Sequence, residues 1–183
     1  MAKLIPFGGK APRIDPRAFV APGAVLIGDI EVGAEASIWY NCVLRGDVNH
    51  IRIGARSNIQ DGTVLHVDSP RPGNTAGLPT IIGEDVLIGH MAMVHGCILH
   101  DRAFVGLGAI VMDGCEIEGG GMLAAGALLP PGRRIPAGQL WAGRPAKYVR
   151  DLSEEELAGQ QAGVDHYVAL AKLHAAALKL PSL

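Results

Sequence analysis

Aliphatic residues recur every six positions through most of the chain. Counted from Ile81 in steps of six, every position as far as Ile135 is Ile, Leu, Val or Met. Shorter runs of the same period lead from Ile14 to Leu44 and from Ile53 to Leu65. A period of six belongs neither to an α-helix nor to a two-sided strand. The longest run consists of Ile81, Leu87, Met93, Leu99, Val105, Val111, Ile117, Leu123, Leu129 and Ile135.

Such a period predicts a coil of three short strands joined by tight corners, with one aliphatic side chain of each strand pointing inward. Stacked coils pair their strands in parallel and bury one another's aliphatic residues, as in other solenoids. Glycine serves corners that need a positive φ or a close approach of two backbones. We therefore expect a parallel β-helix over about residues 11–140. Ile82-Gly83 and Ile88-Gly89 stand one residue off the run, which leaves the phase open there.

Two interruptions and a different C-terminal pattern complete the layout. About three extra residues lie around 46–50, and the segment 68–77 has the composition of a loop. Residues 141–147 are expected to be a connector. Ser153 and Glu156 then form a capping box for a helical tail, which Gly159 and Gly163 are expected to divide into a short and a longer helix. This gives a β-helix domain over 1–150 and a tail over 151–183 that packs on it with an apolar stripe.

Composition narrows the class of protein. Aromatic residues are only 4% of the 183 residues, glycines number 25, and the formal net charge is −2. A thin core of small aliphatic residues fits this composition, and the mixed charge predicts neither a nucleic acid nor a membrane as partner. Cys42, Cys97 and Cys115 are odd in number and lack metal-site spacing, which predicts buried, reduced thiols. With no signal-like segment, the expected location is cytoplasmic.

Three of the seven histidines lie near the loop: His66, His90 and His95. Three neutral imidazoles leave the fourth position of a tetrahedral Zn²⁺ free, and Co²⁺ or Fe²⁺ also suit them. Because His90 and His95 differ by an odd number, a continuous strand would point them to opposite faces. Either a corner separates them or they serve different subunits. A hydrophilic face without a metal is the competing interpretation.

The segments Leu44-Arg45-Gly46-Asp47, Asn58–His66, Ile88-Gly89-His90 and Val94-His95-Gly96 resemble the γ-class carbonic anhydrases over residues 10–150. The resemblance implies a left-handed β-helix and a homotrimer that hydrates CO2 to bicarbonate with a metal-bound hydroxide. It implies that His66 and His95 come from one subunit and His90 from its neighbour. It also implies the roles of five further residues: Arg45 pairs across the interface with Asp61, Gln60 and Asn58 line the CO2 pocket, and Tyr167 lies near the metal.

One departure from that family concerns proton transfer. Val48 follows Asp47 where the founding type of the family has glutamate, and the loop after His66 contains none. The resemblance therefore implies weak activity, unless His50 or Tyr167 carries the proton. Three other functions stay open: a hexapeptide acyltransferase or a thioesterase acting on CoA thioesters, and a non-catalytic metal-binding or assembly module.

Overall fold

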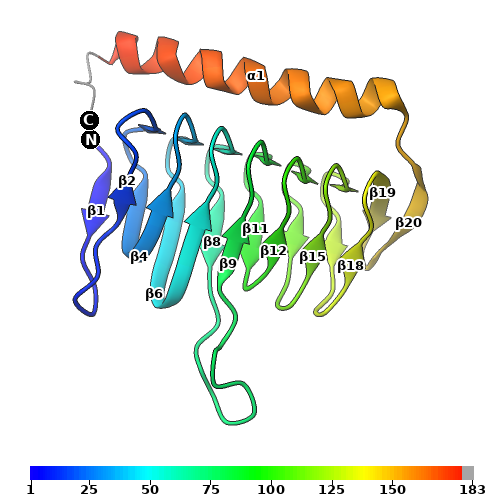
Figure 1. The fold of residues 1–183 in the computed structure, drawn as a ribbon, viewed down its shortest axis with the longest axis horizontal. Helices are drawn as coiled ribbons and strands as arrows, with labels where there is room; N and C mark the ends of the chain where they lie inside the picture. Colours follow the sequence, from blue (N-terminus) through cyan, green and yellow to red (C-terminus); the bar gives the residue numbers. More distant parts are fainter. Residues whose placement is uncertain (179–183) are drawn as a thin grey trace.

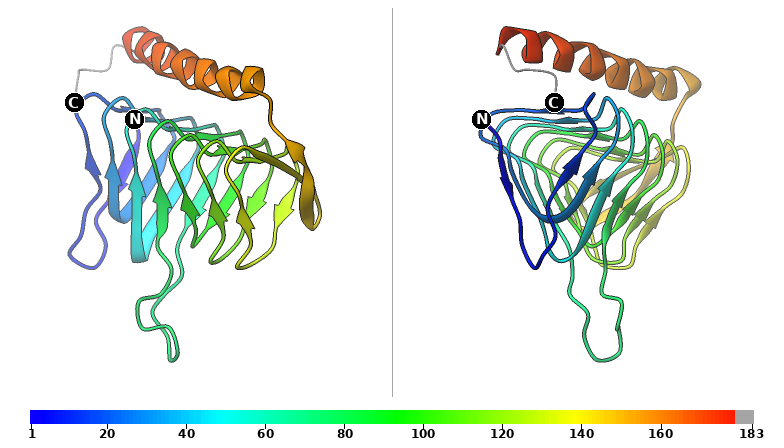
Figure 2. Two further views of the ribbon diagram at one scale, coloured as in Figure 1. Left: turned by 45° about the vertical axis from the view of Figure 1, so that its right-hand side comes forward. Right: turned by 60° about the vertical axis from the view of Figure 1, so that its left-hand side comes forward.

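Short parallel strands stack into a β-helix with a long helix along its side (Figure 1). The computed structural model describes residues 1–178, so residues 179–183 of the predicted tail lie outside the described range. The predicted fold class, a parallel β-helix of hexapeptide repeats followed by C-terminal helix, is confirmed. Seen from the side, the coils form a three-sided prism, and the 66–80 segment projects from it away from the helix (Figure 2).

Two sheets make up the three faces of this prism. One covers two faces and is continuous through its long strands β4 and β6. Its strands are β1 (Lys3–Ile5), β2 (Arg13–Ile14), β4 (Val25–Val32), β6 (Val43–Ile53), β8 (Val64–His66), β9 (Thr80–Ile82), β11 (Met93–His95), β12 (Ile98–Leu99), β14 (Ile110–Val111), β15 (Glu116–Ile117), β17 (Leu128–Leu129) and β18 (Arg134–Ile135).

The second sheet forms the third face, which the helix covers. Its strands are β3 (Phe19–Val20), β5 (Ser37–Ile38), β7 (Asn58–Ile59), β10 (Leu87–Ile88), β13 (Phe104–Val105), β16 (Met122–Leu123), β19 (Gln139–Gly143) and β20 (Ala146–Asp151). The predicted connector at 141–147 is wrong: β19 continues the stack by pairing in parallel with β16, and β20 then turns back antiparallel on β19.

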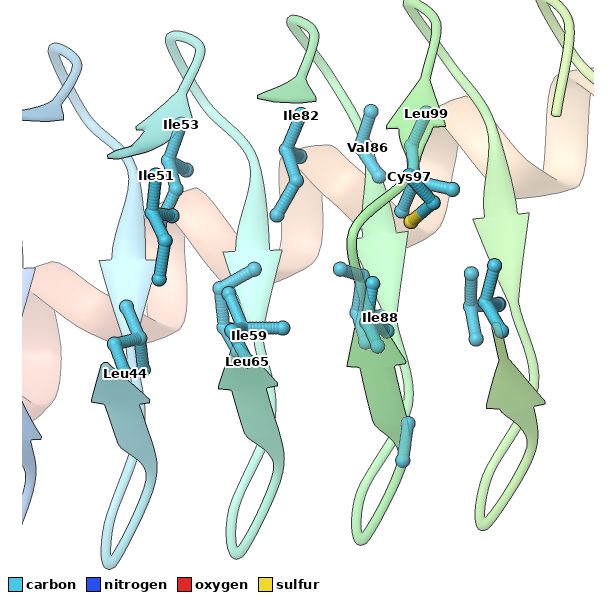
Figure 3. Packing of buried hydrophobic residues seen from close by; sticks show 14 of the residues in the cluster. Leu44, Ile51, Ile53, Ile59, Leu65, Ile82, Val86, Ile88, Cys97 and Leu99 are labelled. Atoms are coloured by element: carbon cyan, nitrogen blue, oxygen red, sulfur yellow. The ribbon is translucent and has the colours of Figure 1, made fainter. Parts of the chain in front are cut away.

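The core is a single column of inward aliphatic side chains (Figure 3). Ile53, Ile59 and Leu65 occupy it as predicted, and so does the run from Leu99 onward. The phase that the sequence left open differs from the six-residue count at the first three members of the long run, where Ile82, Ile88 and Val94 point inward. Met93, for example, is 42% exposed. The step from Val94 to Leu99 is five residues, and Gly96, with φ +51°, makes the tighter turn there. All three cysteines are buried free thiols, as expected; these are Cys42, Cys97 and Cys115.

One unbroken helix, α1 (Glu154–Ala177), follows the strands within the described range. Ser153 and Glu156 form the predicted capping box. The predicted division at Gly159 and Gly163 is wrong. A Cβ at Gly163 would lie 3.2 Å from Cδ1 of Leu87, so this glycine lets the helix approach the sheet closely. No described helix has the length and apolarity needed to cross a membrane.

A column of charged residues follows one corner of the prism beside α1. Glu35, Arg56, Asp85 and Arg102 occupy the same position in four successive coils, all with positive φ, and their charges alternate in sign. We call this column the charged corner. Opposite charges on neighbouring coils attract one another, while like charges would repel.

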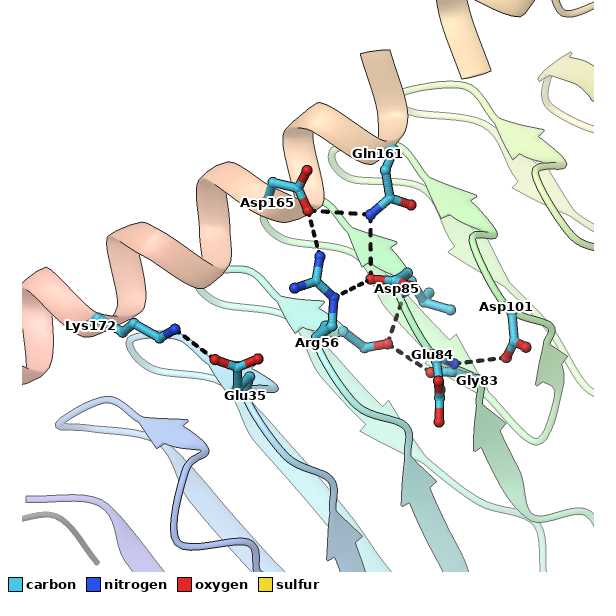
Figure 4. Close-up of polar contacts among 11 residues, drawn as sticks. Glu35, Arg56, Gly83, Glu84, Asp85, Asp101, Gln161, Asp165 and Lys172 are labelled. Carbon is cyan, nitrogen blue, oxygen red and sulfur yellow. Dashed lines mark hydrogen bonds and ion pairs between the residues drawn. The ribbon is translucent and has the colours of Figure 1, made fainter. Parts of the chain in front are cut away.

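The helix carries partners for the first three members of the charged corner (Figure 4). Lys172 Nζ lies 2.6 Å from Glu35 Oε1, and Asp165 Oδ1 lies 2.5 Å from Arg56 Nη2. Gln161 Nε2 lies 3.5 Å from an oxygen of the third member, Asp85. These contacts set the position of α1 along the stack, while its buried Val164, Val168 and Ala171 supply the apolar contact.

Candidate metal centre

His66 and His95 lie side by side on adjacent coils. They end strands β8 and β11, which pair in parallel with these two residues in register. Because Leu65 and Val94 point into the core, the residue that follows each of them points outward. His66 Nδ1 and His95 Nε2 are 2.9 Å apart. The six-residue pattern thus brings two imidazole nitrogens that are 29 residues apart in sequence to one point.

Carboxylates hold the outer nitrogen of each of these two rings. Asp47 Oδ1 lies 3.1 Å from His66 Nε2, and Asp113 Oδ1 is bonded to His95 Nδ1. Arg45 in turn donates to Asp47 Oδ2 at 2.7 Å. A carboxylate on the outer nitrogen orients an imidazole and raises its basicity, which is the usual environment of a metal-binding histidine.

The charge states around this pair follow from its surroundings. Burial alone would raise the pKa of Asp47, but the hydrogen bonds from Arg45 and His66 outweigh it and keep that pKa below its ordinary value. Burial lowers the pKa of His66, and Arg45 acts in the same direction against the opposing hydrogen bond of Asp47. The lowered pKa favours the neutral imidazole of His66, the form that binds a metal.

His90 lies at a different corner, under α1. Its Nδ1 is 2.9 Å from Asp61 Oδ2, and its Nε2 is 3.3 Å from the hydroxyl of Tyr167. Burial raises the pKa of Tyr167, and the nearby Asp61 adds to the rise. Gln60 precedes Asp61 and donates to Asn58 Oδ1 at 3.0 Å, both amides being buried.

The predicted site residues and their partners thus separate into two groups. The loop-side group contains Arg45, Asp47, His66, His95 and Asp113. The helix-side group contains Asn58, Gln60, Asp61, His90 and Tyr167. Within residues 1–178, no three His, Cys, Asp or Glu side chains converge on a point that would hold a metal. The three histidines do not meet within one chain, and their common site stays a prediction between subunits.

The structure gives the surroundings of three further residues whose roles the sequence did not decide. Arg45 pairs with Asp47 within the chain, and the implied pairing of Arg45 with Asp61 joins different subunits and stays a prediction. His50 belongs to neither group; burial lowers its pKa, and nearby Arg52 acts in the same direction. Val48 is 43% exposed beside Asp47.

Sequence reasoning missed Asp113. It lies one coil after His95, at a separation of 18 residues, and that separation is the signal that identifies it. Sequence reasoning also missed Tyr40 and His174, whose side chains meet at 2.8 Å beneath α1.

The donor set on the loop side fits a metal. Two imidazoles with converging nitrogens, each backed by a carboxylate, form two thirds of a three-histidine site. A third imidazole from a neighbouring copy would complete it. Zn²⁺, Co²⁺ and Fe²⁺ all accept this donor set.

Comparisons with known proteins agree with this chemistry. The chain is 48% identical over 168 residues to gamma carbonic anhydrase 2, mitochondrial, of Arabidopsis thaliana, covering 91% of this chain and 59% of that relative. It is 40% identical over 154 residues to a carbonic anhydrase of Geobacillus kaustophilus, covering 84% of this chain and 81% of the relative. No protein-family model matches the chain.

Solved structures share the fold. A hexapeptide transferase family protein from Anaplasma phagocytophilum superimposes with a TM-score of 0.86 at 47% identity, covering 93% of this chain and 96% of that one. Several relatives of high identity carry the carbonic anhydrase name, and the residues that carry the resemblance occupy the two groups described above. The chain belongs to the γ-carbonic anhydrase family.

Proposed function

We propose that this protein catalyses the reversible hydration of CO2 to bicarbonate in a homotrimer, at metal sites between subunits. Each site takes His66 and His95 from one subunit and His90 from the next. The observation that carries the proposal is the division of the site residues into two groups on different faces of one chain. The loop-side group supplies two of the three histidines and the helix-side group the third, so a second copy is needed to complete each site.

An outward apolar column supports the association of copies. It lies on the face between the two groups, where six side chains stand in register on successive coils and remain partly exposed. These are Val25, Val43, Val64, Met93, Ile110 and Leu128. A continuous exposed apolar strip on a regular sheet is typical of a protein interface. Burying it would bring the loop-side group of one subunit towards the helix-side group of the next.

The chain's own residues then have distinct tasks. A bound Zn²⁺ supplies a nucleophilic water whose pKa is lowered to about 7. Asp47 and Asp113 hold the outer nitrogens of His66 and His95, so that the inner nitrogens of the two rings face one another. Gln60 is fixed by its bond to Asn58, and its Oε1 makes no hydrogen bond within residues 1–178, so it is available to orient the attacking water.

The test joins metal analysis with an assay of CO2 hydration. Protein loaded with Zn²⁺, Co²⁺ or Fe²⁺ is expected to bind one metal per chain and to accelerate hydration measured by stopped flow. A metal-loaded trimer without hydration activity at any buffer concentration would contradict the proposed reaction. Hydrolysis or transfer of acyl-CoA thioesters by the same preparation would favour the hexapeptide acyltransferase or thioesterase alternative.

Proton export is expected to limit turnover. Val48 is exposed beside Asp47 and offers no acid, and no glutamate lies in the loop after His66. Val48→Glu is expected to raise kcat about tenfold in dilute buffer, since positioned acids and bases contribute roughly 10² to 10⁴ in rate. The measurement is kcat against imidazole-buffer concentration at fixed pH.

In wild type, kcat should rise with the imidazole-buffer concentration. In Val48→Glu, kcat should depend less on the buffer concentration. Val48→Gln has the same size without the titrating group and serves as control. Fast turnover of wild type that is independent of buffer would show that His50 or Tyr167 already carries the proton.

A further inference from the structure

A small cavity lies between α1 and the far end of the charged corner. Its volume is about 290 Å³. It is at the edge of α1 opposite to His90 and Tyr167, so it is separate from the candidate metal centre. The polar and glycine residues that line it and enter the argument are Asp85, Arg102, Gly120, Gly138, Gln160 and Gln161. We call it the donor cavity, after the hydrogen-bond donors around it.

The hydrogen bonds between coils stop at this point. Along the charged corner, the N–H groups of Arg56, Asp85 and Arg102 each donate to a carbonyl one coil earlier; Arg102 N, for example, is 2.9 Å from Glu84 O. The next two corner residues are Gly120 and Gly138. Within the described residues, their N–H groups donate to no backbone carbonyl. Two main-chain donors at the wall of the cavity are therefore free.

The side chains around the cavity add further free donors. Arg102, whose side chain is exposed, is the one member of the charged corner that makes no ion pair among residues 1–178. Gln160 is only 8% exposed, and its Nε2 has no hydrogen-bond partner. The carboxylate in the wall, Asp85, is already paired with Arg56 at 2.7 Å.

We propose that the donor cavity binds a small oxyanion of the size of bicarbonate or inorganic phosphate. A guanidinium, a buried amide and backbone N–H groups are the donors that recognise such anions in proteins. A buried donor without a partner is costly, and an anion at this point would satisfy it. The anion would also give Arg102 the ion-pair partner that it lacks among residues 1–178.

The test uses inorganic phosphate on the full-length protein at constant ionic strength. Phosphate is expected to raise the Tm of wild type in a saturable manner. Arg102→Gln should weaken the apparent affinity at least tenfold. Arg133→Gln is the matched control, because Arg133 is an exposed arginine of the same solenoid that forms no ion pair within the described range. It should bind phosphate as wild type does.

Two further measurements keep the result independent of folding defects. Gln160→Met removes the buried donor at similar volume, so it should fold at least as stably as wild type without phosphate and yet lose affinity. Crystals soaked in selenate should show the anion between Arg102 and Gln160. Displacement of phosphate by bicarbonate would identify the smaller anion as a ligand of the same site. Phosphate affinity unchanged in Arg102→Gln, or selenate found only elsewhere, would show that the cavity holds water and overturn the proposal.

Discussion

His90→Ala is expected to abolish metal binding and to lower CO2 hydration by roughly 10³-fold or more, since the metal supplies the nucleophile at neutral pH. The β-helix should stay folded, because His90 lies outside the aliphatic column and contacts only Asp61 and Tyr167 through its ring nitrogens. Metal content, kcat/KM and far-ultraviolet circular dichroism measure the three quantities. His100→Ala is the control, since His100 is half exposed and lies 3.6 Å from Glu116, away from both groups of site residues.

The two-group arrangement makes a sharper experiment available. His90→Ala and His95→Ala are each expected to be inactive alone. When they are unfolded together and reassembled in equal amounts, about a quarter of the sites of a cyclic trimer should combine an intact loop-side group with an intact helix-side group. Metal content and activity should both return to about that fraction. No recovery from mixed trimers would show that the three histidines do not come from neighbouring subunits.

Gly54→Ala is expected to lower the free energy of unfolding by about 3 kcal/mol, the upper range for overpacking a rigid site. A Cβ built at Gly54 falls well inside contact distance of the backbone of Gly83, one coil further on, and neither backbone can move without breaking the stack. The measurement is the urea midpoint and slope at equilibrium.

Gly126→Ala separates this clash from simple backbone strain. Gly126 has φ +67° and open space around its Cα, so an alanine there suffers only the left-handed conformation. That costs roughly 1–2 kcal/mol. Equal destabilisation by the two substitutions would mean that the corner at Gly54 opens to admit a methyl group.

The period of six predicted the fold, but not its phase throughout. Leu87 and Met93 are as apolar as the inward residues, for reasons unrelated to the core. Leu87 is buried against Gly163 of α1, and Met93 belongs to the outward apolar column. A residue that is covered from outside looks the same in sequence as one that faces inward. The five-residue step after Val94 then restored the agreement from Leu99 onward.

The candidate site, like the fold, could be predicted only in part from the sequence. His66 and His95 could be placed near one another from the loop. Their register on β8 and β11 could not be predicted, because the sequence does not show where the projecting segment between them ends and the next coil begins. Asp113 has no local motif, because its partner lies one coil away. The single helix was missed because glycine has a low helix propensity, which predicted a break at Gly163. In the structure, the absence of a side chain at Gly163 lets the helix pack closely against Leu87, and helix propensity does not include that contact.

The charged contacts of α1 link the length of the helix to the number of coils. The helix has 24 residues, hence a length of about 36 Å, and each added coil lengthens the stack by about 4.8 Å. That increment equals about three helical residues. A duplication or deletion of one coil between Glu35 and Asp85 would therefore displace Lys172 or Gln161 from its partner, unless about three residues were gained or lost in α1. Insertions in the stack and in the helix are expected to occur together when this architecture changes in size, whereas the 66–80 segment, which projects away from α1, is free to vary in length alone.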